Sequence, residues 1–414
     1  MPANNPVQDI FAEITTVHRV PLCGSFTGDE QTTNRYICSM KKAGILGGGQ
    51  LGRMLLQTAA NYPVITHVME NDENCPAAHL CHHFTKGDIN NFDAVYNFGK
   101  NLDCLTIEIE SVNTEALEKL QQEGVKIYPQ PQALKTIKNK ILQKQFYADN
   151  QIPSSPFRIT QNREELAHHK DFLPAVHKSA TDGYDGRGVQ LIKSFEELGN
   201  GFDVPSVLEK MVDIKKEIAI SIAVSNTGET AIYPPVDMVF DPKLNLLSHQ
   251  LAPAELDEKI FWKLEAVAHT TVKRLNSAGI FAVELFVDHS GNVWVNETAP
   301  RVHNSGHHTI EASYSSQFDM LWRIMLNYPL GNTQPILPAA IVNVLGAPGF
   351  TGPVEYEGLQ EILSMPNVFV HLYGKAVTKP GRKMGHITVL SNDKQELLFR
   401  VNKIKNTLRV ISKG

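Results

Sequence analysis

Two glutamates are expected to face each other across a β-hairpin, where their carboxylates would suit a divalent cation. Segment 281–297 reads FAVELFVDHSGNVWVNE, with apolar residues on both sides of a polar turn. If the four residues HSGN form that turn, Asp288 faces Val293 and the same register places Glu284 opposite Glu297. Like charges in such a position destabilise a ladder by up to about 1 kcal/mol, and a cation reverses that sign. All-oxygen ligation favours Mg²⁺, which usually binds one or two carboxylates together with substrate phosphates. The alternative is a solvated edge where both acids point to water.

A glycine-rich turn at the end of the first apolar strand is suited to binding an anion. The segment GGGQLG at 47–52 satisfies G-x-G-x-x-G, follows a strand and opens a helix. Its main-chain N–H groups can close on a phosphate at the positive end of the helix. Glu70 ends the next predicted strand, near the offset expected of a ribose-binding acid. Taken alone, this segment is typical of a nicotinamide dehydrogenase; the alternative is tight strand–helix packing without a ligand.

Lys178 stands at the base of a second glycine-rich segment. It ends the apolar strand PAVHK and precedes SATDGYDGRG at 179–188. This segment lacks the GK[ST] ending of a Walker A loop. Three glycines framing Tyr, Asp and Arg predict a flap that closes over an anionic substrate and excludes water. The alternative is a plain surface turn between two strands.

Two further clusters of basic residues could hold anions. RVHNSGHH at 301–308 follows the hairpin directly, and Arg301 among these histidines would repel a metal cation. We therefore favour an anion and hydrogen-bond site there over metal ligation. In the second cluster Lys375 precedes KPGRKMGH at 379–386, where Pro-Gly fixes a tight turn suited to phosphate capture.

The elements that must position these residues follow from periodicity. Up to about residue 124 short apolar strands alternate with helices, which predicts a doubly wound, mostly parallel sheet. The strands are expected at 43–46, 64–70 and 104–110, and the helices at 50–60, 92–99 and 114–122. One long helix is expected at 131–150, followed by a linker, PSSP. Strands dominate afterwards, at 174–179, 189–193, 216–240 and 280–297, with helices at 257–275 and 316–326. A third segment from about 334 ends in short strands.

Composition excludes several classes of protein. The chain has 414 residues, 42% of them hydrophobic, and no apolar run reaches the ~18 residues of a membrane span. A formal net charge of −5 gives no general attraction to nucleic acid. Five cysteines without a CxxC pair indicate a reducing compartment rather than a disulfide framework. The cluster CPAAHLCHH at 75–83 lacks the spacing of structural zinc sites, so we interpret it as a strand edge with incidental thiols.

Residues 1–39 differ from the remainder of the chain. They lack the basic and apolar regions of a secretory signal, and they carry more acids than bases, unlike a transit peptide. Met40 opens directly into the first apolar strand. We therefore expect that Met40 is the functional start and that 1–39 is a disordered extension.

Together these segments resemble a known family, the 5-(carboxyamino)imidazole ribonucleotide synthases of the ATP-grasp superfamily. The resemblance covers about 40–414 and rests on GGGQLGRML, GYDGRG, NETAPRVHNSGHH and KPGRKMGH in that order. It implies an α/β fold with a Rossmann-like N-terminal domain at 40–135, a central α+β ATP-grasp domain at 136–333 and a small β-rich C-terminal domain at 334–414. It also implies a cytoplasmic homodimer that carboxylates aminoimidazole ribonucleotide with ATP, Mg²⁺ and bicarbonate through carboxyphosphate. A mutase of purine biosynthesis is the implied pathway partner.

The resemblance also implies roles for individual residues. The metal ligands would be Glu284 and Glu297. ATP would contact Lys140, Lys178, Gly183, Tyr184, Asp185, Gly186, Arg187, Gly188, Glu209, Val212, Glu217, Asn296 and Glu297. The catalytic residues would be Tyr184, Asp185, Arg187, Arg301 and His303. The ribonucleotide would contact Gly49, Gln50, Leu51, Asn304, Lys375, Arg382 and Lys383, so that the first glycine turn would serve its phosphate rather than a dinucleotide.

Some residues depart from the pattern of the family. Asp182 stands where glycine is common, Lys140 where arginine also occurs, and Lys379 where arginine is usual, which weakens bidentate phosphate binding there. Two alternatives remain open. Formate-dependent phosphoribosylglycinamide formyltransferase shares the architecture but is expected to lack the NSGHH and PGRKMGH pairing. A dehydrogenase would explain only 44–70.

Overall fold

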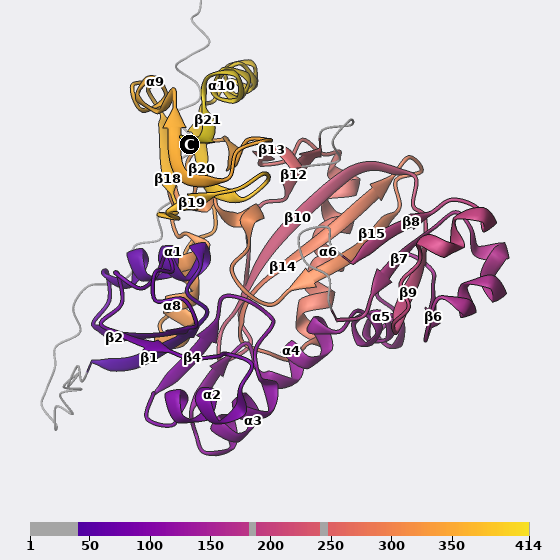
Figure 1. Ribbon diagram of the computed structural model, residues 1–414, viewed down its shortest axis with the longest axis horizontal. Helices are drawn as coiled ribbons and strands as arrows, with labels where there is room; N and C mark the ends of the chain where they lie inside the picture. The colour runs from indigo at the N-terminus through magenta and orange to yellow at the C-terminus, as the bar shows by residue number, and fades with distance from the viewer. Residues whose placement is uncertain (1–39, 182–187, 241–246, 414) are drawn as a thin grey trace, which may run out of the picture. The chain divides into compact units, whose positions relative to one another are not determined.

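The computed structural model describes residues 40–181, 188–240 and 247–413 (Figure 1). Within these ranges the strands form sheets of five, nine, four and three members. None of the helices in the described ranges combines the length and apolar composition that a membrane crossing requires. The expected extension 1–39 and flap residues 183–187 lie outside the described residues.

The N-terminal sheet is parallel throughout and has the order β3-β2-β1-β4-β5. Its strands are β1 (Lys41–Leu46), β2 (Val64–Glu70), β3 (His83–Lys86), β4 (Cys104–Ile107) and β5 (Lys126–Tyr128). Helices α1 (Gln50–Ala59), α2 (Phe92–Gly99) and α3 (Thr114–Gln122) connect them. Ile45 packs in one apolar cluster with α1, whereas Leu46 packs in another with α2 and α3, so both faces are covered. The expected doubly wound sheet is confirmed, although β4 ends at Ile107 rather than at 110.

The helix expected at 131–150 is two helices, so that prediction is wrong. Helix α4 (Pro131–Lys138) ends at Asn139, and α5 (Lys140–Asp149) begins directly after it. Asn139 has an extended backbone, and its side chain accepts hydrogen bonds from the N–H groups of Ile141 and Leu142. Asparagine inside a helical pattern competes for main-chain donors and favours such an N-cap. The break orients α5 separately from α4.

A small antiparallel sheet with the order β6-β9-β7-β8 follows. Its strands are β6 (Phe157–Thr160), β7 (Ala175–Ser179), β8 (Val189–Ile192) and β9 (Ser206–Lys210), covered by the 3₁₀ segments η2 (Glu164–Phe172) and η3 (Phe195–Asn200). The PSSP segment that precedes β6 is held at both ends. The carbonyl of Pro153 accepts from Val295 N–H at 2.7 Å, and Ser155 Oγ donates to the carbonyl of Lys210 at 2.5 Å. It is therefore fixed to two sheets and is not the loose linker that its composition suggested.

His177 on β7 is fully buried in this small sheet. Its Nδ1 accepts a hydrogen bond from Phe202 N–H at 3.2 Å, so the proton of the neutral ring lies on Nε2, which donates to Thr160 Oγ1 at 3.0 Å. A second proton would have to displace the Phe202 bond. Burial lowers the pKa of His177 from 6.5 to about 4.

The stability of the protein is therefore expected to fall in mild acid partly through His177. Below about pH 6.5 the unfolded chain binds this proton and the folded chain does not, so the free energy of unfolding decreases as the pH falls from 6.5 toward 4. At pH 5 this residue costs about 2 kcal/mol. Urea unfolding at pH 5 and pH 8 measures the effect. The free energy of unfolding should differ between the two pH values by about 2 kcal/mol less in His177→Gln than in the wild type. In the exposed control His289→Gln this difference should equal that of the wild type. An unchanged difference in His177→Gln would contradict the role assigned to His177.

The large sheet has the order β15-β14-β10-β12-β13-β16-β20-β18, with β11 beside β10. Its first part comprises β10 (Ile214–Val224), β11 (Thr230–Ile232), β12 (Val236–Phe240), β13 (Leu247–Ala252), β14 (Gly279–Asp288) and β15 (Val293–Ala299). Helix α6 (Glu258–Arg274) packs on β10, β14 and β15, and α8 (Gln317–Leu326) contacts β10, β14 and α1. Trp322 of α8 donates from Nε1 to the carbonyl of Leu55 at 2.8 Å, which joins the N-terminal sheet to this layer.

The C-terminal segment continues the large sheet instead of forming a separate one. Strand β16 (Ala339–Leu345) pairs with β13, and β20 (Lys383–Leu390) and β18 (Val368–Leu372) follow (Figure 1). A three-stranded sheet of β17 (Gly352–Glu357), β19 (Val377–Thr378) and β21 (Arg409–Ser412) lies beside it, with helices α9 (Leu359–Leu363) and α10 (Lys394–Thr407). The sequence pattern did not predict α10 or the eight residues of β20, because it indicated only short strands here.

Candidate active site

The structure confirms that Glu284 faces Glu297, but not through the register that the turn predicts. Val287, and not Asp288, pairs with Val293, and Leu285 pairs with Val295. The register then shifts by one residue at Asn296, which has no partner on β14, and Glu284 pairs with Glu297 beyond it. This β-bulge re-aims the side chains of β15 where the carboxylates meet, as bulges beside functional sites commonly do.

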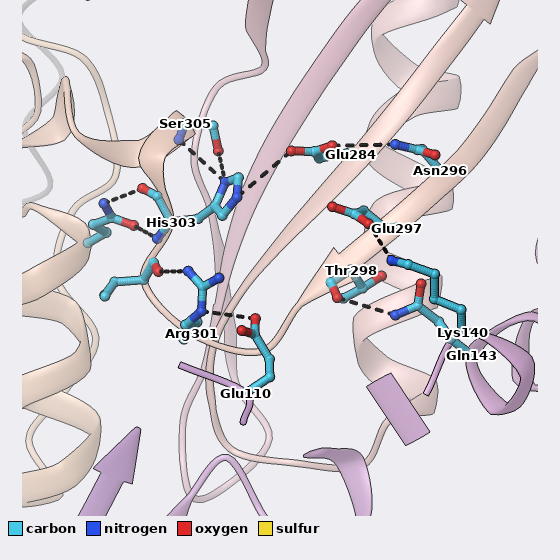
Figure 2. Close-up of polar contacts among 12 residues, drawn as sticks. Glu110, Lys140, Gln143, Glu284, Asn296, Glu297, Thr298, Arg301, His303 and Ser305 are labelled. Carbon is cyan, nitrogen blue, oxygen red and sulfur yellow. Dashed lines mark hydrogen bonds and ion pairs between the residues drawn. The ribbon is translucent and has the colours of Figure 1, made fainter. Parts of the chain in front are cut away.

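Each carboxylate has a cationic or amide neighbour of its own. Glu297 Oε2 lies 3.2 Å from Lys140 Nζ, and Glu284 Oε1 lies 3.8 Å from His303 Nε2. Asn296 Nδ2 donates to Glu284 Oε2 at 3.4 Å. Figure 2 shows His303 directed at Glu284 and Lys140 directed at Glu297. The hairpin thus gathers two acids within a ring of basic and polar groups.

The two acids have opposite electrostatic environments. Burial, and then the charges of Glu297 and Glu217, raise the pKa of Glu284 above its usual range. The ammonium of Lys140 holds the pKa of Glu297 below its usual range despite burial. Glu284 is 19% exposed and Glu297 is 42% exposed at the side chain, so a ligand can reach both. A cation placed between the two carboxylates would offset the repulsion of Glu284 by Glu297.

Lys178 and Glu209 form a second ionic network beside the hairpin. Lys178 Nζ lies 3.1 Å from Glu209 Oε1 and donates to Asn296 Oδ1 at 2.9 Å. Lys144 Nζ approaches the other oxygen, Glu209 Oε2, at 2.9 Å. Burial raises the pKa of Glu209, but the two ammonium groups outweigh it and the net shift is downward. Sequence analysis did not single out Lys144, which is 2% exposed.

Glu217 and Val212 lie close to this network. Ala219 of β10 pairs with Glu284, so Glu217, two residues earlier, points to the same face of the sheet. Burial raises the pKa of Glu217 to about 7, with Lys178 opposing the shift. Val212 is half-buried in the turn that joins β9 to β10. The face of β10 and β14 therefore carries acids next to two lysines.

Internal carboxylates occupy donors of the first glycine turn. Gly48 N–H donates to Glu70 Oε2 at 3.1 Å, and Gly52 N–H donates to Glu108 Oε2 at 2.5 Å. A Cβ on Gly49 would lie 2.1 Å from Glu108 Oε1, which explains the glycine there. Burial raises the pKa of Glu108 to about 7, with the Gly52 N–H opposing the shift. The groups that a dinucleotide pyrophosphate would use are thus already bonded, which removes the basis of the dehydrogenase interpretation.

Glu108 and Glu110 were not identified from the sequence, although a signal for both was present. They follow the buried strand β4 at the carboxyl edge of a parallel sheet, where α/β proteins bind ligands. Glu110 Oε1 lies 2.9 Å from Arg301 Nε, an ion pair visible in Figure 2. Arg301 also donates from an Nη1 hydrogen to the carbonyl of Val302 at 3.1 Å. This pair joins the N-terminal sheet to the segment that follows the hairpin.

The histidine-rich segment is anchored by a buried glutamine. Gln317 Oε1 accepts from His303 N–H, and Gln317 Nε2 donates to the His303 carbonyl, both at 2.8 Å. His303 Nδ1 contacts Ser305 Oγ at 3.0 Å, and Asn304 opens the short 3₁₀ segment η4 (Asn304–Gly306). His303 is consequently fixed with its Nε2 toward Glu284. His307 and His308 are buried behind it.

The basic cluster of the C-terminal segment meets the first glycine turn. Lys375 Nζ donates to Gln50 Oε1 at 2.8 Å and to the carbonyl of Lys383 at 2.7 Å. Arg382 Nη1 donates to the Val377 carbonyl at 2.6 Å. Residues more than 300 positions apart are thus joined at one place, as the predicted ribonucleotide site requires. Leu51 is buried in α1, and Gly188 begins the described chain after the flap.

The Cys/His cluster is occupied with local contacts. Cys75 is buried against Gly48, and His82 Nδ1 contacts Thr66 Oγ1 at 2.9 Å. His83 stacks on His67 with ring centroids 4.6 Å apart. Among residues 40–181, 188–240 and 247–413 no group of three or more His, Cys, Asp or Glu could hold a metal. A cation at Glu284 and Glu297 would therefore need further oxygen ligands from a substrate.

A cavity of about 560 Å³ lies away from these residues. It is lined by Lys41, Cys104 and Lys126, which begin β1, β4 and β5, together with Asn226 and Met325. Ligands of parallel α/β sheets bind at the carboxyl ends of the strands, and this is the opposite edge. The chemistry-bearing residues point instead to the carboxylate hairpin.

Three family models match the chain in succession. They are a ribonucleotide synthetase preATP-grasp domain at 40–138, an ATP-grasp domain at 145–318 and a phosphoribosylaminoimidazole carboxylase C-terminal domain at 339–400. The N5-carboxyaminoimidazole ribonucleotide synthase of Aquifex aeolicus is 33% identical over 377 residues, which cover 89% of this chain and 98% of that protein. Against longer fungal and plant carboxylases the chain spans from 64% to 70% of their length.

Solved structures agree with these matches. The N5-carboxyaminoimidazole ribonucleotide synthetase of Thermotoga maritima superposes with a TM-score of 0.84 at 36% identity, covering 90% of this chain and all of that one. The Aspergillus clavatus enzyme, solved with ADP and 5-aminoimidazole ribonucleotide, gives 0.80 at 32% identity, with 89% and 98% covered. Both structures thus match about nine tenths of this chain. The chain therefore belongs to the N5-carboxyaminoimidazole ribonucleotide synthase family of ATP-grasp ligases.

Proposed function

We propose that this chain carboxylates 5-aminoimidazole ribonucleotide to its N5-carboxyamino form, using ATP and bicarbonate, in purine biosynthesis. The observation that carries the proposal is the opposed pair Glu284 and Glu297, set beside Lys140 and Lys178. Two acids and two cations at one place suit a metal–nucleotide complex, whose phosphates are negative and whose metal is positive.

The residues present fit a Mg²⁺ ion. Glu284 and Glu297 offer oxygen ligands only. Burial first, and then the charge of Glu297, raise the pKa of Glu284, and a cation between the two carboxylates would oppose both effects. Asn296 donates to Glu284 from Nδ2, while its oxygen accepts from Lys178, so this amide links the acid pair to that lysine. When bound, Mg²⁺ would neutralise charge that develops on the transferring phosphoryl group.

The nucleotide would lie over β9, β10 and the hairpin. We assign phosphate contacts to Lys140 and Lys178, and ribose contacts to Glu217. The carboxylate of Glu209 is already held by two ammonium groups, so its contact with adenine, like that of Val212, would come from the main chain. Residues 183–188 would cover the phosphates and exclude water.

The ribonucleotide phosphate would be bound mainly by side chains of the C-terminal segment. Glu70 and Glu108 already accept from the N–H groups of Gly48 and Gly52, so these donors are not open to a phosphate. Lys375 and Lys383, with Arg382, supply positive charge instead, and Gln50 contributes through its bond to Lys375. Gly49 and Leu51 would then shape the turn, and Asn304 would approach the substrate from the other side.

The reaction needs charge neutralisation and exclusion of water. A bicarbonate oxygen attacks the γ-phosphorus, the bond to the ADP oxygen breaks, and carboxyphosphate forms. Carboxyphosphate releases CO₂ and phosphate, and the aminoimidazole amine attacks the CO₂ carbon and loses a proton. His303 lies beside Glu284 and Arg301 lies beside Glu110. Both would orient bicarbonate, with Tyr184, Asp185 and Arg187 closing the site. Without closure, water would consume the labile intermediate.

Release of ADP tests this function. The purified chain should release ADP in a coupled assay only when bicarbonate and aminoimidazole ribonucleotide are both present. ADP release that requires formate and glycinamide ribonucleotide would instead favour the formyltransferase. A change in NADH absorbance with no ADP formed would contradict the proposal.

Three broader features are part of the same proposal and rest on the family. We propose a homodimer, a cytoplasmic location and transfer of the product to a mutase that moves the carboxylate onto carbon. We also propose functional domains at 40–135, 136–333 and 334–414, with Met40 as the start. Sedimentation of the full chain and N-terminal sequencing of the native protein test the dimer and the start.

A further inference from the structure

We propose that Lys144 is a positioning residue that fixes the phosphate-binding ammonium group of Lys178 through Glu209 and keeps this group available to ATP. The inference rests on the proposed function only in that ATP is the ligand. Lys144 lies behind Glu209 rather than at the hairpin, and the resemblance to the family assigns it no role.

The helix that carries Lys144 also carries Lys140, and the two lysines reach different acids. They stand four residues apart on α5, so they project from the same face of the helix. Lys140 Nζ lies 3.2 Å from Glu297, whereas Lys144 Nζ lies 2.9 Å from Glu209. The N-cap at Asn139 sets the start of this helix and therefore the direction of both side chains.

Helix α5 is held rigidly against β15. Tyr147 Oη contacts Thr298 Oγ1 at 2.8 Å. Gln143 Nε2 donates to the Thr298 carbonyl at 3.4 Å (Figure 2). Tyr147 is fully buried and Gln143 is 5% exposed. Because Thr298 directly follows Glu297, the helix keeps a fixed distance to the carboxylate hairpin. Lys144 is thus presented to Glu209 from a fixed support.

The two oxygens of Glu209 divide between two lysines. Oε2 lies 2.9 Å from Lys144 Nζ, and Oε1 lies 3.1 Å from Lys178 Nζ. The side chains of Lys144 and Glu209 are only 3% and 6% exposed, so water cannot replace either partner. Lys178 also donates to Asn296 Oδ1, so Glu209 and Asn296 fix its ammonium between them. Lys144 consequently forms an ion pair with the carboxylate that forms an ion pair with Lys178.

The charges show why the second lysine is needed. Lys144, Glu209 and Lys178 together carry one net positive charge, which is available to an anionic phosphate. If Lys144 were neutral, Glu209 would cancel the charge of Lys178, and the set would carry none. Burial lowers the pKa of Lys144 and outweighs the opposing effect of Glu209, so the net shift is downward. The carboxylate of Glu209, 2.9 Å away, is the neighbour that favours the charged form of this lysine. Without Lys144, the buried carboxylate of Glu209 would have Lys178 as its remaining cationic partner. The ammonium group of Lys178 would then pair more closely with Glu209 and bind the phosphates of ATP less well.

Affinity for ATP measures this effect directly. We expect Lys144→Met to weaken binding of ATP, measured by calorimetry with Mg²⁺ present, by about tenfold or more. Lys135→Met is the matched control, because Lys135 pairs with Glu118 on the neighbouring helix, away from the nucleotide. Its affinity for ATP should equal that of the wild type. Unchanged affinity in Lys144→Met would overturn the proposal.

A double variant separates positioning from simple damage to the fold. Lys144→Met with Glu209→Gln removes one charge of each sign and restores a net positive charge at Lys178. It also avoids an unpaired buried carboxylate, and such neutral replacements are often tolerated in stability. We expect the double variant to bind ATP several-fold more tightly than Lys144→Met alone. If Lys144 only stabilises the fold, the double variant will bind no better than the single variant.

The same variants keep this inference distinct from the proposed function. Binding of ATP does not require that the chain accept aminoimidazole ribonucleotide. If the wild type binds ATP and both variants behave as expected, but no ADP is released with bicarbonate and the ribonucleotide, the proposed function fails and the role of Lys144 stands. If the wild type turns over as proposed but Lys144→Met binds ATP as tightly as the wild type, the role of Lys144 fails and the proposed function stands.

Discussion

Glu284→Gln and Glu297→Gln are each expected to abolish turnover, with kcat reduced by about a thousandfold or more, while the protein stays folded. Each substitution removes one of the two opposed carboxylates proposed to hold the metal of the metal–ATP complex. Because Glu284→Gln removes a like-charge contact, its free energy of unfolding should stay the same or rise by up to about 1 kcal/mol. In Glu297→Gln the lost ion pair with Lys140 opposes that gain, so little net change is expected. Steady-state ADP release and urea unfolding measure the two effects.

Glu258→Gln is the matched control for this pair. Glu258 is exposed in the first turn of α6 and is not among the residues proposed to bind a substrate or the metal, so the same change of carboxylate to amide should leave kcat unaltered. Wild-type turnover in either hairpin variant would remove the metal assignment. A large loss of stability in both would instead mean that the pair serves mainly the fold.

Lys375→Met and Lys383→Met are expected to raise the KM for aminoimidazole ribonucleotide by about a hundredfold, with the KM for ATP changed less than about twofold. Loss of a hydrogen bond between an ammonium group and a phosphate costs about 3 kcal/mol, which corresponds to this factor. Lys375→Met also breaks the bond to Gln50, so its effect should be the larger. Initial rates with each substrate varied separately provide the test.

Lys403→Met on α10 controls for the loss of a lysine in the same segment. Lys403 forms a half-exposed pair with Glu361, and both KM values should match the wild type. Unchanged KM for the ribonucleotide in Lys375→Met and Lys383→Met would place the phosphate elsewhere. A fall in kcat alone would show that these lysines act in the transition state rather than in binding.

The sequence was sufficient to pair Glu284 with Glu297, but the register behind that prediction was wrong near the turn. The bulge at Asn296 compensates for a turn that is shifted by one residue. A bulge depends on the packing of both strands, so counting residues across a turn cannot reveal it. The correct pair was therefore reached through an incomplete account of the hairpin.

Motifs predicted residues in contiguous segments and missed those that matter through tertiary contacts. Lys144 belongs to no motif and gains its place only because α5 begins anew at Asn139. Glu108 fills the glycine turn from a strand that lies 56 residues away from Gly52 in the chain. The join of β13 to β16 likewise arises in the folded sheet and leaves no local signature. Local periodicity determines elements, whereas these contacts depend on how the elements meet.

Transfer of oxygen from bicarbonate to phosphate tests the central claim most directly. If a bicarbonate oxygen attacks the γ-phosphorus of ATP, turnover in ¹⁸O-labelled bicarbonate with aminoimidazole ribonucleotide must leave one labelled oxygen in the phosphate released. Mass spectrometry of that phosphate, in freshly mixed reactions to limit exchange with water, gives the result. We predict that the amount of ¹⁸O-labelled phosphate is proportional to the amount of ADP formed. Unlabelled phosphate released at the full rate would contradict the formation of carboxyphosphate.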